Sequence, residues 1–293
     1  MDRRFVNHIP QKFIPMKLDI LFKMVFGSSK VILGDFLSAV VGSKVEVEEI
    51  INNELAKENL AEKKSILDVL ASLEGGSKAN IEVQLSSHNM FSERSLYYWS
   101  KLYGRQIPEG FDYSHLRKVI CINIVDFNLQ TNKDITHYHT EFNIRREDGK
   151  LFSDHLSLHF LELPKLTESK EPVNRLELWL KFLNAESEEE LKMISDKDSL
   201  LSDAYLERIK AFADEAKMHE IDARQKELMD SITSINYAKQ EGRKEGRKEG
   251  KQEGKQEGRI EVVKEMYAGG MSIETIAKVL KQSEAEIRKY VNM

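Results

Sequence analysis

The sequence predicts an α/β core followed by an all-helical C-terminal arm. Up to about residue 185, some segments place apolar residues at helical spacing and others form short β-prone runs. Beyond residue 186 the chain is charged and shows only helical patterns, including a glycine repeat. We therefore expect a core over residues 1–185, a helical arm over 186–260 and a small helical terminus over 261–293.

The composition is typical of a folded protein with many solvated helices. The chain has 293 residues, of which 41% are hydrophobic and 32% charged. No apolar run approaches the roughly 20 residues that span a bilayer, and the first residues, MDRRFVNHIPQKFIP, lack the apolar region of a secretory signal. Cys121 is the only cysteine in the sequence. We expect a cytoplasmic protein with no membrane association.

The net charge of −5 does not decide whether the protein binds nucleic acid. An enzyme that meets DNA briefly needs only a local basic surface, so an acidic total is compatible with a DNA substrate.

The first elements are helical, and a hairpin follows them. Apolar residues recur at helical spacing from Leu18 to Val40, and Gly27-Ser28-Ser29 breaks this run in two. After a charged stretch from Glu46 to Lys64, the period changes. SILDVLASL and KANIEVQL are β-prone, and Glu74-Gly75-Gly76-Ser77 between them is a strong hairpin signal.

The remaining core elements alternate between helix and strand. A helix is expected from about Phe91 to Leu102. HLRKVICINIVDF then reads as a strand buried on both faces. HTEFNIR and SDHLSLHFLEL are two further strands, and Asn174 is placed to cap the helix RLELWLKFL. Together these elements predict a mixed sheet flanked by helices.

The hairpin carries two acidic residues whose placement depends on its loop. Strand residues i and i+2 share a face, so Glu82 and Gln84 point the same way. With the three-residue loop Glu74-Gly75-Gly76, Asp68 lies directly opposite Glu82, and the two Cβ atoms are about 5 Å apart. A two-residue turn would put the acids on opposite faces. We expect a loop with an odd number of residues or a compensating bulge.

Two carboxylates at this separation favour a divalent cation. Without one, they repel each other and the pKa of one rises. Mg²⁺, or Mn²⁺ in its place, prefers oxygen ligands and usually takes one or two protein carboxylates. A metal held by Asp68 and Glu82 polarises a scissile phosphate and activates a water, and the Gln84 amide orients either one. The alternative is that both acids belong to an ordinary solvated strand face.

The segments LDILFKMVFG, ILDVLASLEGG, NIEVQ, FSERSLYYWSKLYGRQIPEGFDYSHLRKVICINIVDF and LHFLEL occur in this order over roughly residues 13–165. Read together, they resemble the Rpn family of recombination-promoting nucleases, also described as PD-(D/E)XK nuclease family transposases. The resemblance implies a restriction-endonuclease-like (PD-(D/E)XK) α/β core and a divalent metal. It also implies DNA cleavage linked to recombination, mobile elements or phage defence.

The resemblance also implies roles for individual residues. Asp68 is similar to the family's aspartate on the second core strand, and Glu82 to the acid of the (D/E)-x-K element. Gln84 occupies the lysine position of that element. The backbone carbonyl of Val83 is an implied extra metal ligand, and Asp19, in a D-x-x-F-K motif, resembles an acid that completes such sites. The neutral Gln84 removes a cationic stabiliser of the transition state, which implies slow, tightly regulated or absent cleavage.

The helix after the hairpin carries a basic stripe. Arg94, Tyr97 or Tyr98, Lys101 and Arg105 recur every three or four residues and so lie on one side of a helix. Such a stripe can hold DNA phosphates without reading bases. The alternative is a solvated helix face with the tyrosines in the core.

The histidines raise the question of zinc. His137 and His139 share a strand face, with His155 and His159 nearby in the sequence, but no cysteine cluster or H-E-x-x-H motif accompanies them. We expect ordinary surface or core histidines.

The helical arm contains a four-residue repeat, EGRKEGRKEGKQEGKQEG, over residues 241–258. Its glycines advance about 40° per step around a helix and form a groove without side chains. Each glycine costs about 1 kcal/mol relative to alanine, so a helix here needs a partner. We expect the same helix of a second subunit, which gives a homodimer or a higher homo-oligomer. The alternative is a flexible charged linker.

The last segment, SIETIAKVLKQSEAEIRKYV, has the rhythm of a small helix-turn-helix. Lys278, Lys281, Arg288 and Lys289 are placed to meet DNA phosphates. Alternatively, this hairpin serves only for packing or dimerisation.

Taken together, these features predict a Mg²⁺-dependent DNA endonuclease of low sequence specificity. The alternative is a catalytically inactive binding or regulatory module that keeps the nuclease fold and acts through its helical C-terminal arm.

Overall fold

A computed structural model of the chain describes residues 9–10, 12–51, 54–55, 65–66, 68–86, 90–107, 110, 112–166 and 172–292. Leu67, in the predicted run SILDVLASL, and most of the predicted charged stretch lie outside these residues. The chain divides into two compact units, Met1–Lys226 and Glu227–Met293.

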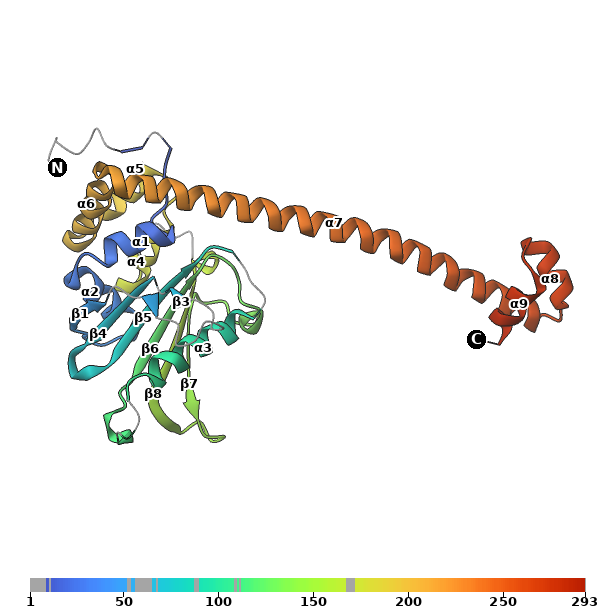
Figure 1. Cartoon of the computed structure of the whole chain (residues 1–293), viewed down its shortest axis with the longest axis horizontal. Coiled ribbons are helices and arrows are strands. Elements are labelled where there is room, and N and C mark those ends of the chain that lie inside the picture. Colours follow the sequence, from blue (N-terminus) through green and yellow to red (C-terminus); the bar gives the residue numbers. More distant parts are fainter. Residues whose placement is uncertain are drawn as a thin grey trace. The chain divides into compact units, whose positions relative to one another are not determined.

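The first unit is built on a six-stranded mixed sheet with the order β1-β4-β5-β6-β8-β7 (Figure 1). Its β5–β6 and β6–β8 pairs are parallel, and the other pairs are antiparallel. The strands are β1 (Val47–Ile51), β4 (Val69–Leu73), β5 (Lys78–Gln84), β6 (Val119–Val125), β7 (His139–Arg145) and β8 (Leu151–Glu162), and the short β2 (Glu54–Leu55) and β3 (Ser65–Ile66) form a second sheet. The predicted mixed sheet flanked by helices is confirmed.

The helices lie where the apolar periodicity places them. They are α1 (Asp19–Phe26), α2 (Lys30–Val41), α3 (Phe91–Gly104), α4 (Arg175–Asn184), α5 (Glu188–Ser195), α6 (Ser199–Ala213), α7 (Glu215–Ala268), α8 (Ile273–Leu280) and α9 (Glu284–Val291). The predicted break between α1 and α2 is confirmed. The predicted cap of α4 is confirmed too, since the Asn174 side chain accepts a 2.8 Å hydrogen bond from the Glu177 amide.

The two faces of the sheet are covered differently. On one face, Phe91 and Leu102 of α3 pack with Cys121 of β6 and Leu158 of β8. The helices α1, α2 and α4 join in an aromatic cluster, made by Phe22, Phe26, Phe36, Trp179 and Phe182. Strand β6 is buried along its whole length, as its apolar sequence predicts.

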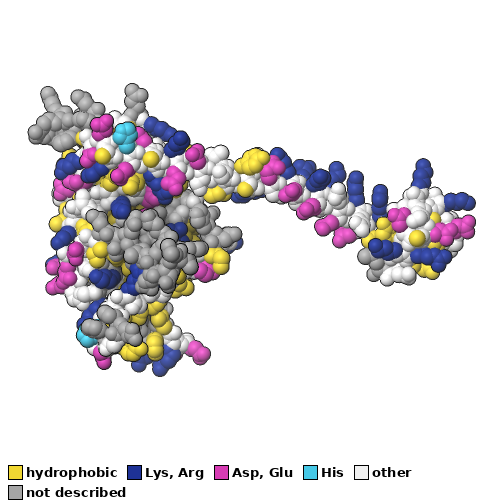
Figure 2. All heavy atoms as spheres, viewed as in Figure 1, with side chains coloured by type: hydrophobic (Ala, Val, Ile, Leu, Met, Phe, Trp, Pro, Cys, Tyr) yellow, Lys and Arg dark blue, Asp and Glu magenta, His cyan; other side chains and the backbone are white. Residues whose placement is uncertain are grey.

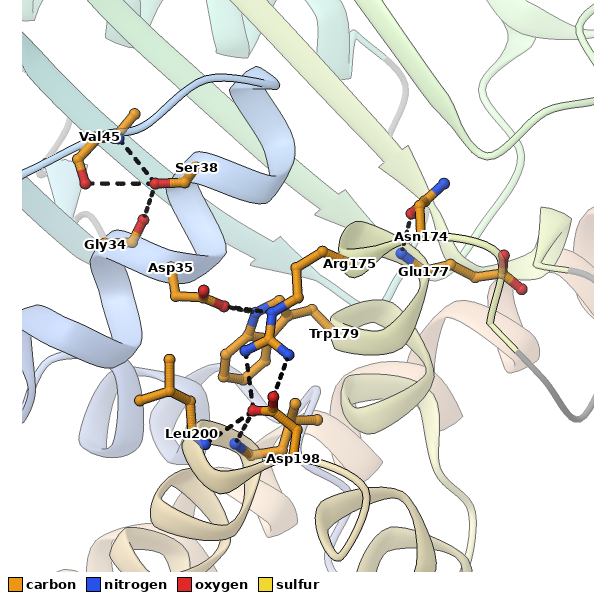
Figure 3. A network of polar contacts seen from close by, with 11 residues as sticks. Gly34, Asp35, Ser38, Val45, Asn174, Arg175, Glu177, Trp179, Asp198 and Leu200 are labelled. Atoms are coloured by element: carbon orange, nitrogen blue, oxygen red, sulfur yellow. Dashed lines mark hydrogen bonds and ion pairs between the residues drawn. The ribbon is translucent and has the colours of Figure 1, made fainter.

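A polar network ties α2, α4 and α6 together (Figure 3). Arg175 donates to Asp35 of α2 at 2.7 Å and pairs with Asp198, the N-cap of α6, at 2.8 Å. The Trp179 indole donates to the same Asp35 carboxylate at 2.6 Å. One guanidinium thus joins three helices that are distant in sequence.

Strand β1 was not predicted, because its sequence was interpreted only as part of a charged stretch. It pairs antiparallel with β4 at the edge of the sheet. Glu48 and Glu49 are exposed there, and an edge strand with acidic residues lacks the apolar pattern of a central strand.

The first unit extends beyond residue 185, the expected end of the core. Helix α6 contacts α1 and α5, and its Arg208 is fully buried and donates to the Ile14 carbonyl at 3.1 Å. The apolar face of α6 therefore packs into the core, although the sequence analysis placed this segment in the charged helical arm.

Among the described residues, no single helix is long and apolar enough to cross a membrane. Helices α1 and α2 reach that length and apolarity only as a pair, with a bend of 111° between them. Their apolar side chains, such as Phe22 and Leu33, are buried in the core.

The second unit contains the later part of α7 with α8 and α9. Val263 of α7 packs with Ile276 and Ala277 of α8 and with Ile287 of α9. The expected helical terminus over residues 261–293 consists of the end of α7 followed by α8 and α9. The glycine repeat is helical throughout, as part of α7.

Candidate active site

The hairpin between β4 and β5 has the expected register. A single turn, Glu74–Gly76, joins the strands, and the Leu73 amide donates to the Ser77 carbonyl at 2.9 Å. Gly75 and Gly76 have φ values of 79° and 82°, which favour glycine. Val69 pairs with Ile81 and Leu70 with Asn80. The predicted three-residue loop is confirmed.

Asp68 lies at the start of β4, and the register places it opposite Glu82. Its Oδ2 accepts a 2.7 Å hydrogen bond from the Val83 amide. The carboxylate thereby takes the place of a backbone acceptor at the end of the β4–β5 ladder. This bond fixes Asp68 against β5.

Glu82 is buried in an environment that disfavours its charge. Its exposed fraction is 4%, and its Oε1 has no hydrogen-bond partner among the described residues. Burial raises the pKa of Glu82 to about 8, with the charge of Asp68 adding to the rise and Arg94 opposing it. Burial also raises the pKa of Asp68 to about 6, against the hydrogen bond from Val83. The pair is therefore costly to ionise without a cation.

These residues fit a divalent cation. The unpartnered Glu82 oxygen and the repulsion between the two carboxylates are both relieved by a positive ion between them. The N–H and C=O of one strand residue point to the same side, so the Val83 carbonyl is directed to the edge where Asp68 lies. Among the described residues, no three His, Cys, Asp or Glu side chains converge as a metal cluster. Mg²⁺ suits such a pair, because it keeps several waters.

A family model described as PD-(D/E)XK nuclease family transposase matches residues 16–238. The chain belongs to this family. No curated protein and no solved structure matches it. The matched range contains the hairpin, α3 and the first part of α7. The mixed sheet with flanking helices is consistent with the PD-(D/E)XK fold, and membership connects the chain with nuclease or transposase-related activity.

By the resemblance, Glu82 and Gln84 occupy the two ends of the family's (D/E)-x-K element, and the side chain at the lysine position is neutral. Gln84 is half-buried, and its amide donates to Ser86 at 3.4 Å. The cation that pairs with Glu82 comes instead from α3, where Nη2 of Arg94 lies 3.5 Å from Glu82 Oε2. The sequence interpretation assigned Arg94 only to DNA phosphates. The neutral Gln84 was the signal to search for a cation elsewhere.

Asp19, the implied third acid, is held by an arginine. Its carboxylate accepts from Arg224 of α7 at 3.0 and 2.7 Å, and a second guanidinium nitrogen lies 2.5 Å away. Asp19 is close enough to Asp68 to raise the pKa of that carboxyl. It thus lies beside the acid pair, in an ion pair that the sequence does not predict.

The residues of the basic stripe lie along α3 and at its end. The Arg94 guanidinium lies 5.2 Å from the centre of the Tyr98 ring, and Lys101 Nζ lies 5.9 Å from the centre of the Tyr97 ring. Arg105 is the C-cap residue. Arg94 and Tyr98 thus lie near Glu82. Burial raises the pKa of the Tyr98 hydroxyl, and the charge of Glu82 adds to this rise.

His139 and His159 belong to a partly buried hydrogen-bond network. His139 Nε2 lies 2.9 Å from His159 Nδ1, His159 Nε2 lies 2.9 Å from Ser157 Oγ, and Ser157 donates to Glu141 at 3.0 Å. Because Ser157 gives its one proton to Glu141, it accepts from His159, which in turn accepts from His139. His155 instead contacts the Tyr103 hydroxyl at 2.8 Å.

These hydrogen-bonded histidines lie apart from the acid pair. They border a cleft of about 850 Å³ that α2, α4 and β7 line. Burial lowers the pKa of His159 to about 4. Among the described residues, no histidines gather with other ligand side chains as a metal cluster.

Proposed function

We propose that this protein is a DNA endonuclease of low sequence specificity that depends on Mg²⁺ or Mn²⁺. The observation that carries the proposal is the pair of Asp68 and the buried Glu82, in which one Glu82 oxygen lacks a partner among the described residues. Membership of a nuclease family makes a phosphodiester the fitting substrate. A role in recombination, mobile elements or phage defence, and a cytoplasmic location, belong to the same proposal.

Each residue of the site has a separate role in the proposed reaction. Asp68, fixed by the Val83 amide, and Glu82 would hold the metal, together with the Val83 carbonyl. The bound metal supplies a polarised phosphate and an activated water. Gln84 orients the water or a phosphate oxygen, and Asp19 assists when Arg224 releases it. Lys101 and Arg105 hold neighbouring phosphates along α3 without reading bases.

Cleavage of a supercoiled plasmid in Mg²⁺ or Mn²⁺ tests this function. Asp68→Asn keeps an acceptor for the Val83 amide but loses the charge, and Glu82→Gln keeps the shape of the buried side chain. We expect each variant to lose at least about 100-fold in rate, while the exposed Glu147→Gln cleaves like the wild type. Equal nicking by all four proteins would remove the enzyme claim. A wild type without cleavage would favour the inactive binding or regulatory module.

The arm supports self-association in this proposal. The glycines of the repeat are exposed, and a Cβ added at Gly246 or Gly250 would meet nothing within 4 Å. A helix with five such glycines gains stability from a partner packed against them. We assign that role to α7 of a second copy, which gives a homodimer or a higher homo-oligomer.

A further inference from the structure

The strand that carries Glu82 and Gln84 offers no positively charged side chain at the candidate site. If the proposed nuclease function holds, another element must supply this charge. Phosphodiester cleavage builds negative charge on the phosphate oxygens, and a cationic side chain aimed at them is worth several kcal/mol. In the family's (D/E)-x-K element, a lysine is placed to supply such a charge. Here that position holds Gln84, which has no charge at any pH.

Arg94 brings a cation to the same place from a different element. Its Nη2 lies 3.5 Å from Glu82 Oε2. The Tyr98 ring, one turn further along α3, lies under the guanidinium at 5.2 Å. A guanidinium on an aromatic ring is restricted in orientation. Arg94 is therefore held at the acid pair and does not extend into solvent like an ordinary surface arginine.

The contact of Arg94 with Glu82 is loose, and the guanidinium also donates a hydrogen bond to the Tyr98 hydroxyl. A charge-assisted hydrogen bond between a guanidinium and a carboxylate is usually about 2.7–2.9 Å long, so a separation of 3.5 Å is loose. The Arg94 Nε is buried and has no acceptor among the described residues. An arginine that served only to neutralise Glu82 would be expected to use this donor on it.

The side chain is also accessible from outside. Arg94 is 38% exposed, whereas Glu82 is 5% exposed at its side chain. A cation that replaced Arg94 as the partner of Glu82 would leave the guanidinium beside the acid pair, with Nη2 released from the carboxylate and available to a phosphate.

We propose that Arg94 is a catalytic residue that supplies, from α3, the positive charge that Gln84 lacks on β5. It donates to the nonbridging oxygens of the scissile phosphate. A water oxygen bonds to phosphorus while the bond from phosphorus to the leaving sugar oxygen breaks. One water proton passes to solvent, and the sugar oxygen takes up one proton from solvent.

The test combines loss and rescue in the full-length protein. We expect Arg94→Gln to lower kcat for plasmid cleavage by about 100- to 1,000-fold. DNA affinity in Ca²⁺, where binding is measured without turnover, should change less than about fivefold. Mn²⁺ affinity without DNA should not fall, because Arg94 competes with a cation for Glu82. The double variant Arg94→Gln with Gln84→Lys should have a kcat at least tenfold higher than that of Arg94→Gln alone. The exposed Arg146→Gln is the matched control and should cleave like the wild type.

Arg94→Lys keeps the charge and gives a second variant if Arg94→Gln does not fold. It should fold, by circular dichroism, and retain a kcat between those of the wild type and Asp68→Asn. If Arg94→Gln, or Arg94→Lys in its place, cleaves at the wild-type rate while Asp68→Asn is inactive, Arg94 is not catalytic and the nuclease function stands. Loss of DNA affinity in Ca²⁺ as large as the loss of kcat makes Arg94 a binding residue and overturns the proposal. A wild type that does not cleave overturns both proposals.

Discussion

At the scale of single residues, the site combines two acids that destabilise each other. Glu82 is buried, and one of its oxygens has no partner in the part of the chain that the structure describes; Asp68 is held beside it by the Val83 amide. A purely structural strand would gain from an apolar residue at either position, because an isolated buried carboxylate is costly. In the proposed function, a cation bound between the two acids offsets this loss of stability.

The first prediction concerns the stability that the protein loses by burying the Glu82 carboxyl. In EDTA at pH 7.5, Glu82→Gln should unfold at a higher temperature than the wild type, by an amount on the order of 1 kcal/mol in unfolding free energy. Burying a neutral amide costs less desolvation free energy than burying a carboxylate, and it is this desolvation that raises the pKa of Glu82 to about 8. Added Mg²⁺ should raise the melting temperature of the wild type only. A variant less stable than the wild type in EDTA would contradict this account of the site.

The second prediction concerns pH. Burial lowers the pKa of His159 from 6.5 to about 4, so the unfolded chain binds a proton there more readily than the folded protein. The stability that neutral His159 contributes is present above about pH 6.5 and is lost as the pH falls toward 4. The melting temperature should decrease over this window, and the decrease should be smaller in His159→Gln. Parallel curves for the two proteins would show that His159 is not the group responsible.

At the scale of elements, the first turns of α7 are bonded to Asp19, which lies beside the acid pair. Arg224 holds Asp19 through contacts of 2.5 to 3.0 Å, and Asp19 and Arg224 shift the pKa of Asp68 in opposite directions. Helix α7 thus begins beside the candidate metal site. The position of Arg224 has consequences for cation binding there.

The third prediction follows from this contact. Arg224→Gln should bind Mn²⁺ about three- to tenfold more tightly, because the change removes a positive charge and releases the Asp19 carboxylate. Titration followed by the Mn²⁺ resonance signal measures this affinity directly. The exposed Lys226→Gln removes an equal charge nearby and should change the affinity by less than twofold. Equal affinities in all three proteins would mean that Arg224 does not regulate the site.

At the scale of the whole molecule, the repeat gives the second unit an uneven charge distribution. Each four-residue step carries a glutamate and a glycine on one side of α7 and basic or amide side chains on the other. Figure 2 shows lysine and arginine side chains gathered along this part of the chain, with acidic ones on a different side. The glycine side is the one on which a second helix can approach closely.

The fourth prediction tests that approach. The wild type should have the mass of a dimer or a larger assembly in light scattering, and Gly246→Leu combined with Gly250→Leu should shift it toward the monomer. Gly246→Ala with Gly250→Ala is the matched control, because alanine favours the helix by about 1 kcal/mol per position and adds little bulk. An unchanged mass in the leucine variant would show that the glycines do not form an interface.

The sequence by itself determined the helices, the central strands and the register of the hairpin. These features depend on local periodicity and on the loop Glu74–Gly76, and residues close in sequence fix both. The opposition of Asp68 and Glu82 followed from that register. Only the tertiary structure decided which positively charged side chain contacts which acid. Arg94 reaches Glu82 from α3, and Arg224 reaches Asp19 from α7, because packing of the elements, and not spacing along the chain, brings these groups together.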